Sequence, residues 1–458
     1  MSSLLSKEHI VARPNFNRWL IPPCALATHL CIGQAYAISV FNLPLTQQLG
    51  ITKSLPEDWK LTELGWIFTI AIFFLGASAA VFGKWVQARG PRMSGLVSAL
   101  CWGAGFLIGS LGIQLHNLWL VYFGYGVLGG CGLGIGYITP VSTLIAWFPD
   151  RRGMATGMAI MGFGGGALVA SPLSVLLMKQ FASPTSTGVA QTWLVLGLVY
   201  LLVMSAGAFG YRVPAPGWKP QGWVPSPVKA GALMAKYDVT PGRAITTKQF
   251  WCLWVVLCFN VTAGIGVLGQ ASAMIQEVFK GTINAGAAAG FVGLLSLFNM
   301  GGRFIWASLS DKIGRKATYA CFFLLGPALY ALVPLSGQIG SVVLFVGCFC
   351  VILTMYGGGF ATIPAYLADV FGTKYVGAVH GRLLTAWSVA GILGPVLVNY
   401  LREFQIQSGI PKYQAYNVTM YIMAGLLVIA FFANLAVKPV SEQLTEREPQ
   451  TGGRPVTA

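Results

Sequence analysis

Stretches of about 20 apolar residues recur along nearly the whole sequence. A stretch of this length is what an α-helix needs to cross the hydrocarbon core of a bilayer. Only 9% of the 458 residues are charged, against roughly 25% in an average soluble domain. The pattern predicts an all-α membrane protein and argues against a soluble enzyme.

We predict twelve transmembrane helices. Their expected spans are residues 18–45, 62–83, 93–112, 118–147, 153–178, 191–212, 248–276, 285–309, 317–335, 341–369, 375–401 and 415–437. The apolar run after Arg18 is longer than the apolar core of a signal peptide and lacks a clear small-residue cleavage site. It is therefore retained as the first helix.

The formal net charge of +16 follows mostly from topology, because positively charged loops stay on the cytoplasmic side of a membrane. With both termini inside, twenty-two of the 29 Lys and Arg residues fall on the cytoplasmic side and six on the outer side, while Arg303 falls within a helix. We therefore expect a protein of the bacterial cytoplasmic (inner) membrane. Its partner is the lipid bilayer, with some attraction to anionic lipid, and not nucleic acid.

A proline-rich polar stretch divides the chain into six plus six helices. The expected units are residues 1–212 (first half), 213–247 (cytoplasmic linker), 248–437 (second half) and 438–458 (cytoplasmic tail). The halves resemble each other at an offset of 224, where GKWVQARGPR from Gly83 matches ASLSDKIGRK from Ala307. Two homologous six-helix halves indicate a transporter with its substrate site between them, near the membrane midplane.

These two matching loops resemble the signature loop of the major facilitator superfamily, a glycine followed by an acid, a basic pair and a second glycine. The residues that fit it in the second half are Asp311, Lys312, Gly314, Arg315 and Lys316, and in the first half Gly83, Gly90 and Arg92. The first half departs from the pattern, because Gln87 takes the acidic position. The resemblance implies ionic contacts across the cytoplasmic gate; a basic loop that only fixes orientation is the alternative.

A narrower resemblance rests on five motifs that together cover most of the twelve-helix region. They are AYAISVF from Ala35, GYITPVSTLIAWFPDRRGMATG ending at Gly157, FNMGGR ending at Arg303, SDKIGR from Ser310 and LLTAWSVAGILGP ending at Pro395. This combination is similar to the oxalate/formate antiporter family, distant relatives of the monocarboxylate transporters. It implies the major facilitator fold and a small carboxylate anion as substrate.

Arg303 is the strongest candidate for substrate binding. At about 1.5 Å per residue it lies about 12 Å from Asp311 at the inner end of its helix, close to the middle of the bilayer. A charge at this depth costs perhaps 2.5–3.5 kcal/mol on insertion scales, and all thirteen acidic residues lie at helix ends, in loops or in the tails. A guanidinium fork can bind a carboxylate with two hydrogen bonds. The resemblance agrees, since an arginine at this place binds the substrate carboxylate in the family.

The first helix offers further candidates. His29, Gly33 and Tyr36 are spaced by four and three residues, so they share one face of an α-helix and the two side chains could look into a central cavity. The alternative for His29 is that its side chain only forms a hydrogen bond to a neighbouring helix. Gln34 lies off this face and is kept because its equivalent orients groups of the cavity in the resembling family.

In the tenth and eleventh helices Tyr356, Phe360 and Trp387 could form an apolar wall for a small anion, although simple packing would give the same spacing. The resemblance also shows two departures. Trp387 stands where the dicarboxylate exchanger of the family has a second cation, and Tyr36 stands where the monocarboxylate relatives have a lysine. With one central cation, a monoanion such as formate, pyruvate or lactate leaves less uncompensated charge than oxalate.

The sequence thus predicts a secondary transporter of small organic anions that works by alternating-access exchange, without a cofactor or metal, as a monomer. Proton-coupled symport is the alternative, but Asn299 replaces the aspartate that the monocarboxylate relatives carry four residues before the arginine. Oxalate/formate exchange stays open, and drug efflux is disfavoured because the midplane lacks a carboxylate. An embedded enzyme is disfavoured too, since no intramembrane Asp pair or HExxH motif is visible.

Overall fold

The computed structural model describes residues 2–224, 238–441 and 444. Its long helices follow the apolar stretches of the sequence. They are α2 (Ile21–Ile32) continuing through Gly33–Phe41 into α3 (Asn42–Leu45), α4 (Leu61–Arg89), α5 (Pro91–Gln114), α6 (Leu118–Val121) continuing through Tyr122–Gly129 into α7 (Gly130–Trp147), α8 (Arg152–Phe181), α9 (Val189–Gly210), α11 (Lys248–Val278), α12 (Ala285–Ile313), α13 (Arg315–Gln338), α14 (Val342–Phe371), α15 (Val376–Leu383), α16 (Thr385–Gln407) and α17 (Asn417–Ala436).

Eleven of these helical segments are long and apolar enough to cross a membrane by length and composition. The one predicted span outside these eleven is residues 285–309, which lie in helix α12, and α12 has 29 residues. It carries Asn299 and Arg303 inside its apolar stretch, which lowers its hydropathy. The predicted all-helical membrane fold is confirmed.

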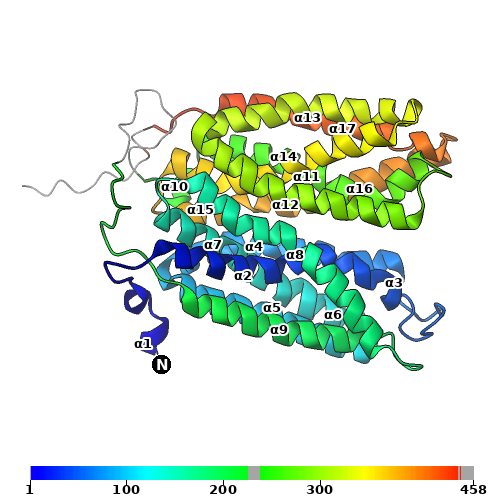
Figure 1. Cartoon of the computed structure of the whole chain (residues 1–458), viewed down its shortest axis with the longest axis horizontal. Helices are drawn as coiled ribbons and strands as arrows, with labels where there is room; N and C mark the ends of the chain where they lie inside the picture. The colour runs from blue at the N-terminus through cyan, green and yellow to red at the C-terminus, as the bar shows by residue number, and fades with distance from the viewer. Residues whose placement is uncertain (1, 225–237, 442–443, 445–458) are drawn as a thin grey trace, which may run out of the picture.

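The helices form two bundles that lie side by side (Figure 1). One bundle contains helices α2 to α9 and the other contains helices α11 to α17, and they meet where α12 and α14 pack on α8 and where α15 and α16 pack on α4. The division into halves at residues 213–247 stays a prediction, and residues 225–237 of this linker lie outside the described residues. The same holds for most of the tail, residues 442–443 and 445–458.

Three of the predicted spans, the first, the fourth and the eleventh, are not uniform α-helices. The fourth contains a π-helical section, Tyr122–Gly129. The first changes at Gly33 into a 3-10 helix that runs to Phe41, where a Cβ on Gly33 would collide with the carbonyl oxygen of Phe163 in α8. The eleventh breaks at Leu384 between α15 and α16, where the Leu384 carbonyl lies against Gly76 of α4. At Gly33 and at Leu384 a close contact with another helix coincides with the change in helix geometry.

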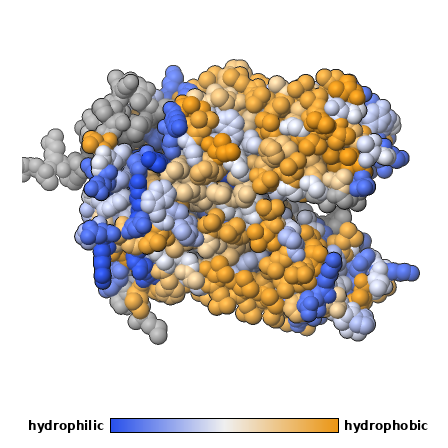
Figure 2. Space-filling model, in the orientation of Figure 1, coloured by the Kyte–Doolittle hydropathy of each residue, from blue (hydrophilic) through white to orange (hydrophobic). Residues whose placement is uncertain are grey.

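The end of the molecule that holds the N-terminus and α10 (Pro241–Ala244) is named the linker end here (Figure 1). Hydrophilic residues gather at this end, apolar residues cover the middle, and the molecule is notched between the bundles at the opposite end (Figure 2). The start of α2 is fixed at the linker end by an ion pair of 2.6 Å between Arg18 and Asp150. Partial burial acts to raise the pKa of Asp150, but the Arg18 guanidinium holds it below its usual value.

Glycines allow very close helix contacts in the first half. A Cβ on Gly134 of α7 would collide with the carbonyl oxygen of Leu75 and the hydroxyl of Ser78, both in α4. Small residues of this kind let helix backbones approach each other in membranes, where packing replaces the hydrophobic effect as the driving force. The contact between α4 and α7 therefore depends on the absence of a side chain at this position.

We expect Gly134→Ala to destabilise the protein by about 1–3 kcal/mol, because an added methyl group in a close-packed contact forces the backbone to move. The measurement is the apparent melting temperature of the detergent-solubilised protein. It is determined from the amount of protein that remains in the size-exclusion peak after heating. Gly425→Ala in α17 is the matched control, since nothing lies within 4 Å of its Cβ position. Equal melting temperatures for both variants would contradict the packing argument.

Candidate binding site

Arg303 lies at the boundary of the two bundles and is fully buried. Its Nε donates to Oδ1 of Asn299 at 3.1 Å, one turn earlier in α12, and its Nη1 lies 3.4 Å from the carbonyl oxygen of Ile160 in α8. Its Nη2 has no hydrogen-bond partner among the described residues. No acidic side chain in the part of the chain that the structure describes forms an ion pair with it.

Aromatic rings surround the guanidinium. Its central carbon lies 5.2 Å from the ring centre of Phe360 and 5.7 Å from that of Phe163, distances at which a ring face attracts a cation. Trp387 packs on both rings, at 4.4 Å from Phe360 and 5.4 Å from Phe163. The rings exclude water, so the charge interacts strongly with any anion that reaches it.

The two candidate tyrosines close the same group of rings. Tyr36 and Tyr356, one from each bundle, form a hydrogen bond of 3.1 Å between their hydroxyl groups. Tyr36 also lies 6.5 Å from Trp387 and edge-on to Phe163 at 5.0 Å. The structure therefore places Tyr36, Tyr356, Phe360 and Trp387 in one group with Arg303 and Asn299.

Two other candidates lie elsewhere. Oε1 of Gln34 accepts a hydrogen bond from the Tyr125 hydroxyl at 3.2 Å, inside the first bundle. His29 packs edge-on to Tyr137 at 5.4 Å, one layer closer to the linker end than Tyr36. The 3-10 geometry after Gly33 has three residues per turn, so the face shared by His29 and Tyr36 in an ideal α-helix is not continued.

Sequence reasoning did not find Tyr137 or Phe163, which both contact Trp387, at 5.3 and 5.4 Å. Tyr137 lies in the GYITPV motif and Phe163 in a GFGGG run. The signal that could have found them is their glycine neighbours. Gly136 precedes Tyr137, and Gly162 and Gly164 flank Phe163. A Cβ at each of these glycines would lie against another helix, so the large side chain beside them stands next to a close helix contact.

The gate candidates of the second half contact the first bundle at the linker end. Asp311 accepts hydrogen bonds from the backbone N–H groups of Gly153 and Met154 at 2.8 and 2.9 Å, at the start of α8. Arg315 pairs with Asp311 at 2.6 Å and with Asp369 at 3.2 Å. These contacts hold the bundles together where helix α8 presents its positive N-terminal end to the carboxylate.

Asp369 extends this network into the first bundle, because its carboxylate also pairs with Arg152 at 3.0 Å. It thus accepts from one arginine of each bundle. Together with Asp311 it links the two bundles at the linker end.

The remaining gate candidates do not cross between the bundles. Arg92 donates to the carbonyl oxygens of Leu4 at 2.9 Å and Phe209 at 3.1 Å. Lys316, its equivalent in the second half, donates to the carbonyl oxygens of Leu435 and Val437, both at 2.8 Å. Each of them anchors the end of the last helix of its own bundle, and Lys312 is exposed.

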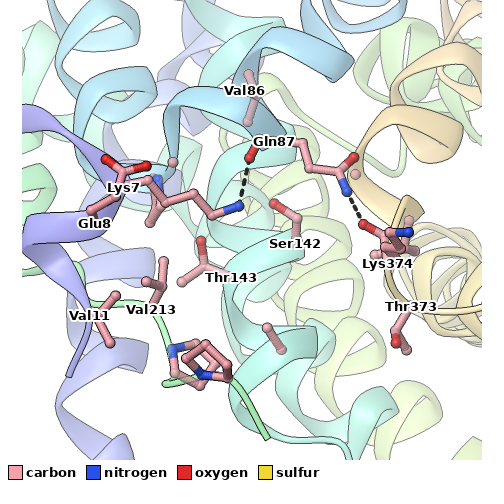
Figure 3. A pocket seen from close by; sticks show the side chains of 17 residues that line it. Lys7, Glu8, Val11, Val86, Gln87, Ser142, Thr143, Val213, Thr373 and Lys374 are labelled. Atoms are coloured by element: carbon pink, nitrogen blue, oxygen red, sulfur yellow. Dashed lines mark hydrogen bonds between the residues drawn. The ribbon is translucent and has the colours of Figure 1, made fainter. Parts of the chain in front are cut away.

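The corresponding place in the first half holds a cavity of about 540 Å³ at the linker end (Figure 3). The backbone of Gln87 accepts from Lys7 at 3.0 Å, and its side-chain amide donates to the carbonyl oxygen of Lys374 in the other bundle. Gln87 occupies the position of Asp311 but cannot offer a negative charge to the start of α15. At this place the Gln87 side chain therefore contacts the other bundle without a charge.

Residues 24–395 match the family model described as Major Facilitator Superfamily. The chain is 28% identical over 379 residues to the oxalate:formate antiporter of Oxalobacter formigenes, covering 82% of this chain and 83% of that protein. It is 24% identical over 379 residues to apicoplast pyruvate carrier 1 of Toxoplasma gondii, covering 72% and 68%. Its fold matches the crystal structure of the Escherichia coli fucose:proton symporter with a TM-score of 0.65 at 13% identity, covering 92% and 99%. The resemblance and the fold class predicted from the sequence are confirmed.

We expect Asp311→Asn to open the linker end in a larger share of molecules. The substitution removes a charge that accepts two backbone hydrogen bonds and pairs with Arg315, and hydrogen bonds to charged groups contribute about 1.5–3 kcal/mol each. The measurement is the distance distribution between spin labels at the exposed positions Lys84 and Ile313, in a background without the native cysteines.

Asp58→Asn provides the control for this experiment. Asp58 also accepts three backbone N–H bonds, from Leu49, Gly50 and Leu55, but they lie within a single loop of the first half. Its substitution should leave the distance distribution unchanged. If Asp311→Asn also leaves it unchanged, Asp311 does not hold the gate.

Proposed function

The chain belongs to the Major Facilitator Superfamily, and we propose that it exchanges small organic monocarboxylates across the membrane with Arg303 as the residue that binds the carboxylate. Its relatives include an oxalate:formate antiporter and monocarboxylate transporters, so the chain is a transporter related to these proteins. The observation that carries the finer proposal is the buried Arg303 guanidinium, which has an unpartnered nitrogen and no acidic partner among the described residues.

The surroundings of Arg303 favour a single negative charge. Its Nη2 lacks a partner in the part of the chain that the structure describes, and the rings around it offer the hydroxyls of Tyr36 and Tyr356. Trp387, at the place of the family's second cation, is fully buried and carries no charge. A monoanion neutralises the site, whereas a dianion leaves one negative charge in a low-dielectric environment.

The same charge balance favours exchange. When the two bundles rock about the site, an empty Arg303 carries its charge through the low-dielectric centre of the membrane, and a bound monoanion removes this barrier. The return step should therefore be fast only with an anion bound. Asn299, whose side chain accepts a hydrogen bond from Arg303 at 3.1 Å, is a neutral amide and cannot supply a negative charge in place of that anion.

We expect Arg303→Ala to abolish exchange in proteoliposomes, because losing one partner of a buried charged hydrogen bond costs about 2–5 kcal/mol, or at least about 30-fold in affinity. Arg303→Lys should also be strongly impaired, since it lacks the planar fork. Uptake of labelled formate, pyruvate and lactate is measured in vesicles that contain the same unlabelled anion or none.

Arg89→Ala, at an exposed arginine, is the control and should keep full exchange. Preloaded vesicles should take up label much faster than empty vesicles. Near-normal uptake by Arg303→Ala would refute the binding role. Stronger uptake into empty vesicles under an inward proton gradient would replace exchange with proton symport.

We expect oxalate to compete less well than formate or pyruvate for the wild-type protein. Trp387→Lys should shift this ratio toward oxalate, because it adds a second positive charge beside Phe360 and Phe163. Trp387→Phe keeps the ring without the charge and should leave the ratio as it is. The measurement is the concentration of each anion that halves labelled formate exchange, and an unchanged ratio in Trp387→Lys would show that this side chain does not face the anion.

A further inference from the structure

The cavity of about 540 Å³ at the linker end has no role in the proposed function (Figure 3). Three residues of its wall correspond, between the two halves of the sequence, to the charged residues that link the bundles beside α8. A carboxylate, a guanidinium and a second carboxylate in one half are replaced by neutral side chains in the other, and the cavity lies where the charged groups are missing. At offsets of 224 and 223, the matches are Gln87 with Asp311, Pro91 with Arg315 and Ala146 with Asp369.

The backbone around the cavity repeats the backbone of the other half. The α4–α5 and α12–α13 loops each turn at a glycine with positive φ, 84° at Gly90 and 86° at Gly314. The N–H group of each glycine donates at 3.0 Å to the carbonyl oxygen four residues earlier. The start of α15 matches the start of α8, since FGTKYVGA from Phe371 aligns with FPDRRGMA from Phe148. The two places can therefore be compared group by group.

The start of α15 lacks the anion that the start of α8 has. The N–H groups of Gly153 and Met154 donate to the Asp311 carboxylate at 2.8 and 2.9 Å. Their equivalents, Val376 and Gly377, are buried and line the cavity. The Val376 N–H reaches a carbonyl three residues earlier at 3.4 Å, and the Gly377 N–H has no acceptor among the described residues. A buried N–H group without an acceptor is rare in proteins, which indicates that a further acceptor belongs in the cavity.

Positive charge surrounds the same cavity. Lys7 extends its Nζ to the backbone oxygen of Gln87 at 3.0 Å, and Lys374 lines the cavity from the other bundle (Figure 3). Glu8 is the single acid among the described lining residues, and it is exposed to solvent. The N-terminal end of α15 adds the positive end of a helix dipole. The missing acceptor is therefore expected to carry a negative charge.

From these observations we infer that the cavity is a binding site for a small free oxyanion, a carboxylate or a phosphate, which stands where Asp311 stands in the other half. The bound oxyanion accepts hydrogen bonds from the start of α15 in one bundle and pairs with Lys7 on the other. It thereby links the two bundles and favours the conformation in which they are in contact at the linker end. The site regulates this contact and does not depend on Arg303 or on the substrate proposed for it.

The first test is the apparent melting temperature of the detergent-solubilised protein. Phosphate or acetate replaces chloride at constant ionic strength, so that general screening of charges does not change. We expect either oxyanion to raise the melting temperature of the wild type by roughly 2 °C at saturation, because a ligand that binds only the folded protein stabilises it. Lys7→Gln should require a several-fold higher concentration for the same rise.

Gln87→Asp places a carboxylate at the position equivalent to Asp311. In chloride it should melt like the wild type with bound oxyanion, and added phosphate or acetate should raise it no further. Gln249→Asp is the matched control, because the Gln249 amide also donates to a backbone carbonyl, that of Pro439, within the second half. Gln249→Asp and Arg303→Ala should both keep the response of the wild type, since neither position lines the cavity.

The second test asks whether the oxyanion links the bundles. Spin labels at Lys84 and Ile313 are measured in the Asp311→Asn background, where the link in the other half is weakened. Added phosphate should increase the share of short distances, and the further substitution Gln87→Asp should give the same increase in chloride alone. An unchanged distance distribution would show that the oxyanion does not link the bundles.

Other outcomes would overturn the site itself. These are no rise in the wild type with either oxyanion, an equal rise in Gln87→Asp, and a rise that disappears in Arg303→Ala, which would assign the oxyanion to the central site. A rise with phosphatidylglycerol in nanodiscs but not with free oxyanions would assign the cavity to a lipid headgroup. If Gln87→Asp does not fold, Ala146→Asp places a carboxylate at another, exposed position of the wall and should remove the response in the same way.

Discussion

The central constraint on this protein is one positive charge, Arg303, that is buried without a negative partner among the residues that the structure describes. Within them, Arg303 contacts neutral acceptors, Asn299 and the Ile160 carbonyl, and two aromatic rings. A charge in this position is unfavourable unless something in the environment compensates it. In the function proposed here, a substrate anion that binds and leaves supplies this compensation. The selectivity proposed for the site follows from that role.

The contacts between the bundles at the linker end differ between the two predicted signature loops. In one half a carboxylate, Asp311, meets the start of α8 and draws Arg315 and Asp369 into an ionic network. In the other half Gln87 makes an amide contact to Lys374 beside a large cavity. The charged contacts between the bundles are therefore concentrated around the start of α8, where α12 and α14 reach it.

The helical spans could be predicted from hydropathy because a bilayer requires long apolar helices and little else is compatible with it. Local geometry inside the spans could not. The 3-10 segment after Gly33 and the break at Leu384 coincide with close approaches of α8 and α4, and a sequence window contains no information about such neighbours.

For the site, Arg303 stood out because charge is rare in an apolar helix. Tyr137 and Phe163 did not, since every face of such a helix is apolar and periodicity does not show which ring points inward. The histidines His29 and His380 could be located in the sequence, but not their shared contact with Tyr137, which depends on packing between α2, α7 and α15.

The nine residues Gly33–Phe41 have a mechanical consequence. A residue advances about 2.0 Å in a 3-10 helix and 1.5 Å in an α-helix, so this segment is about 4–5 Å longer than the same residues in α-helical form. Winding it into an α-helix would also turn Tyr36 by about 60° relative to Gly33, given 120° against 100° per residue. The first helix therefore contains an extensible section, which could change its length and the direction of one site tyrosine while the helix that carries Arg303 stays in place.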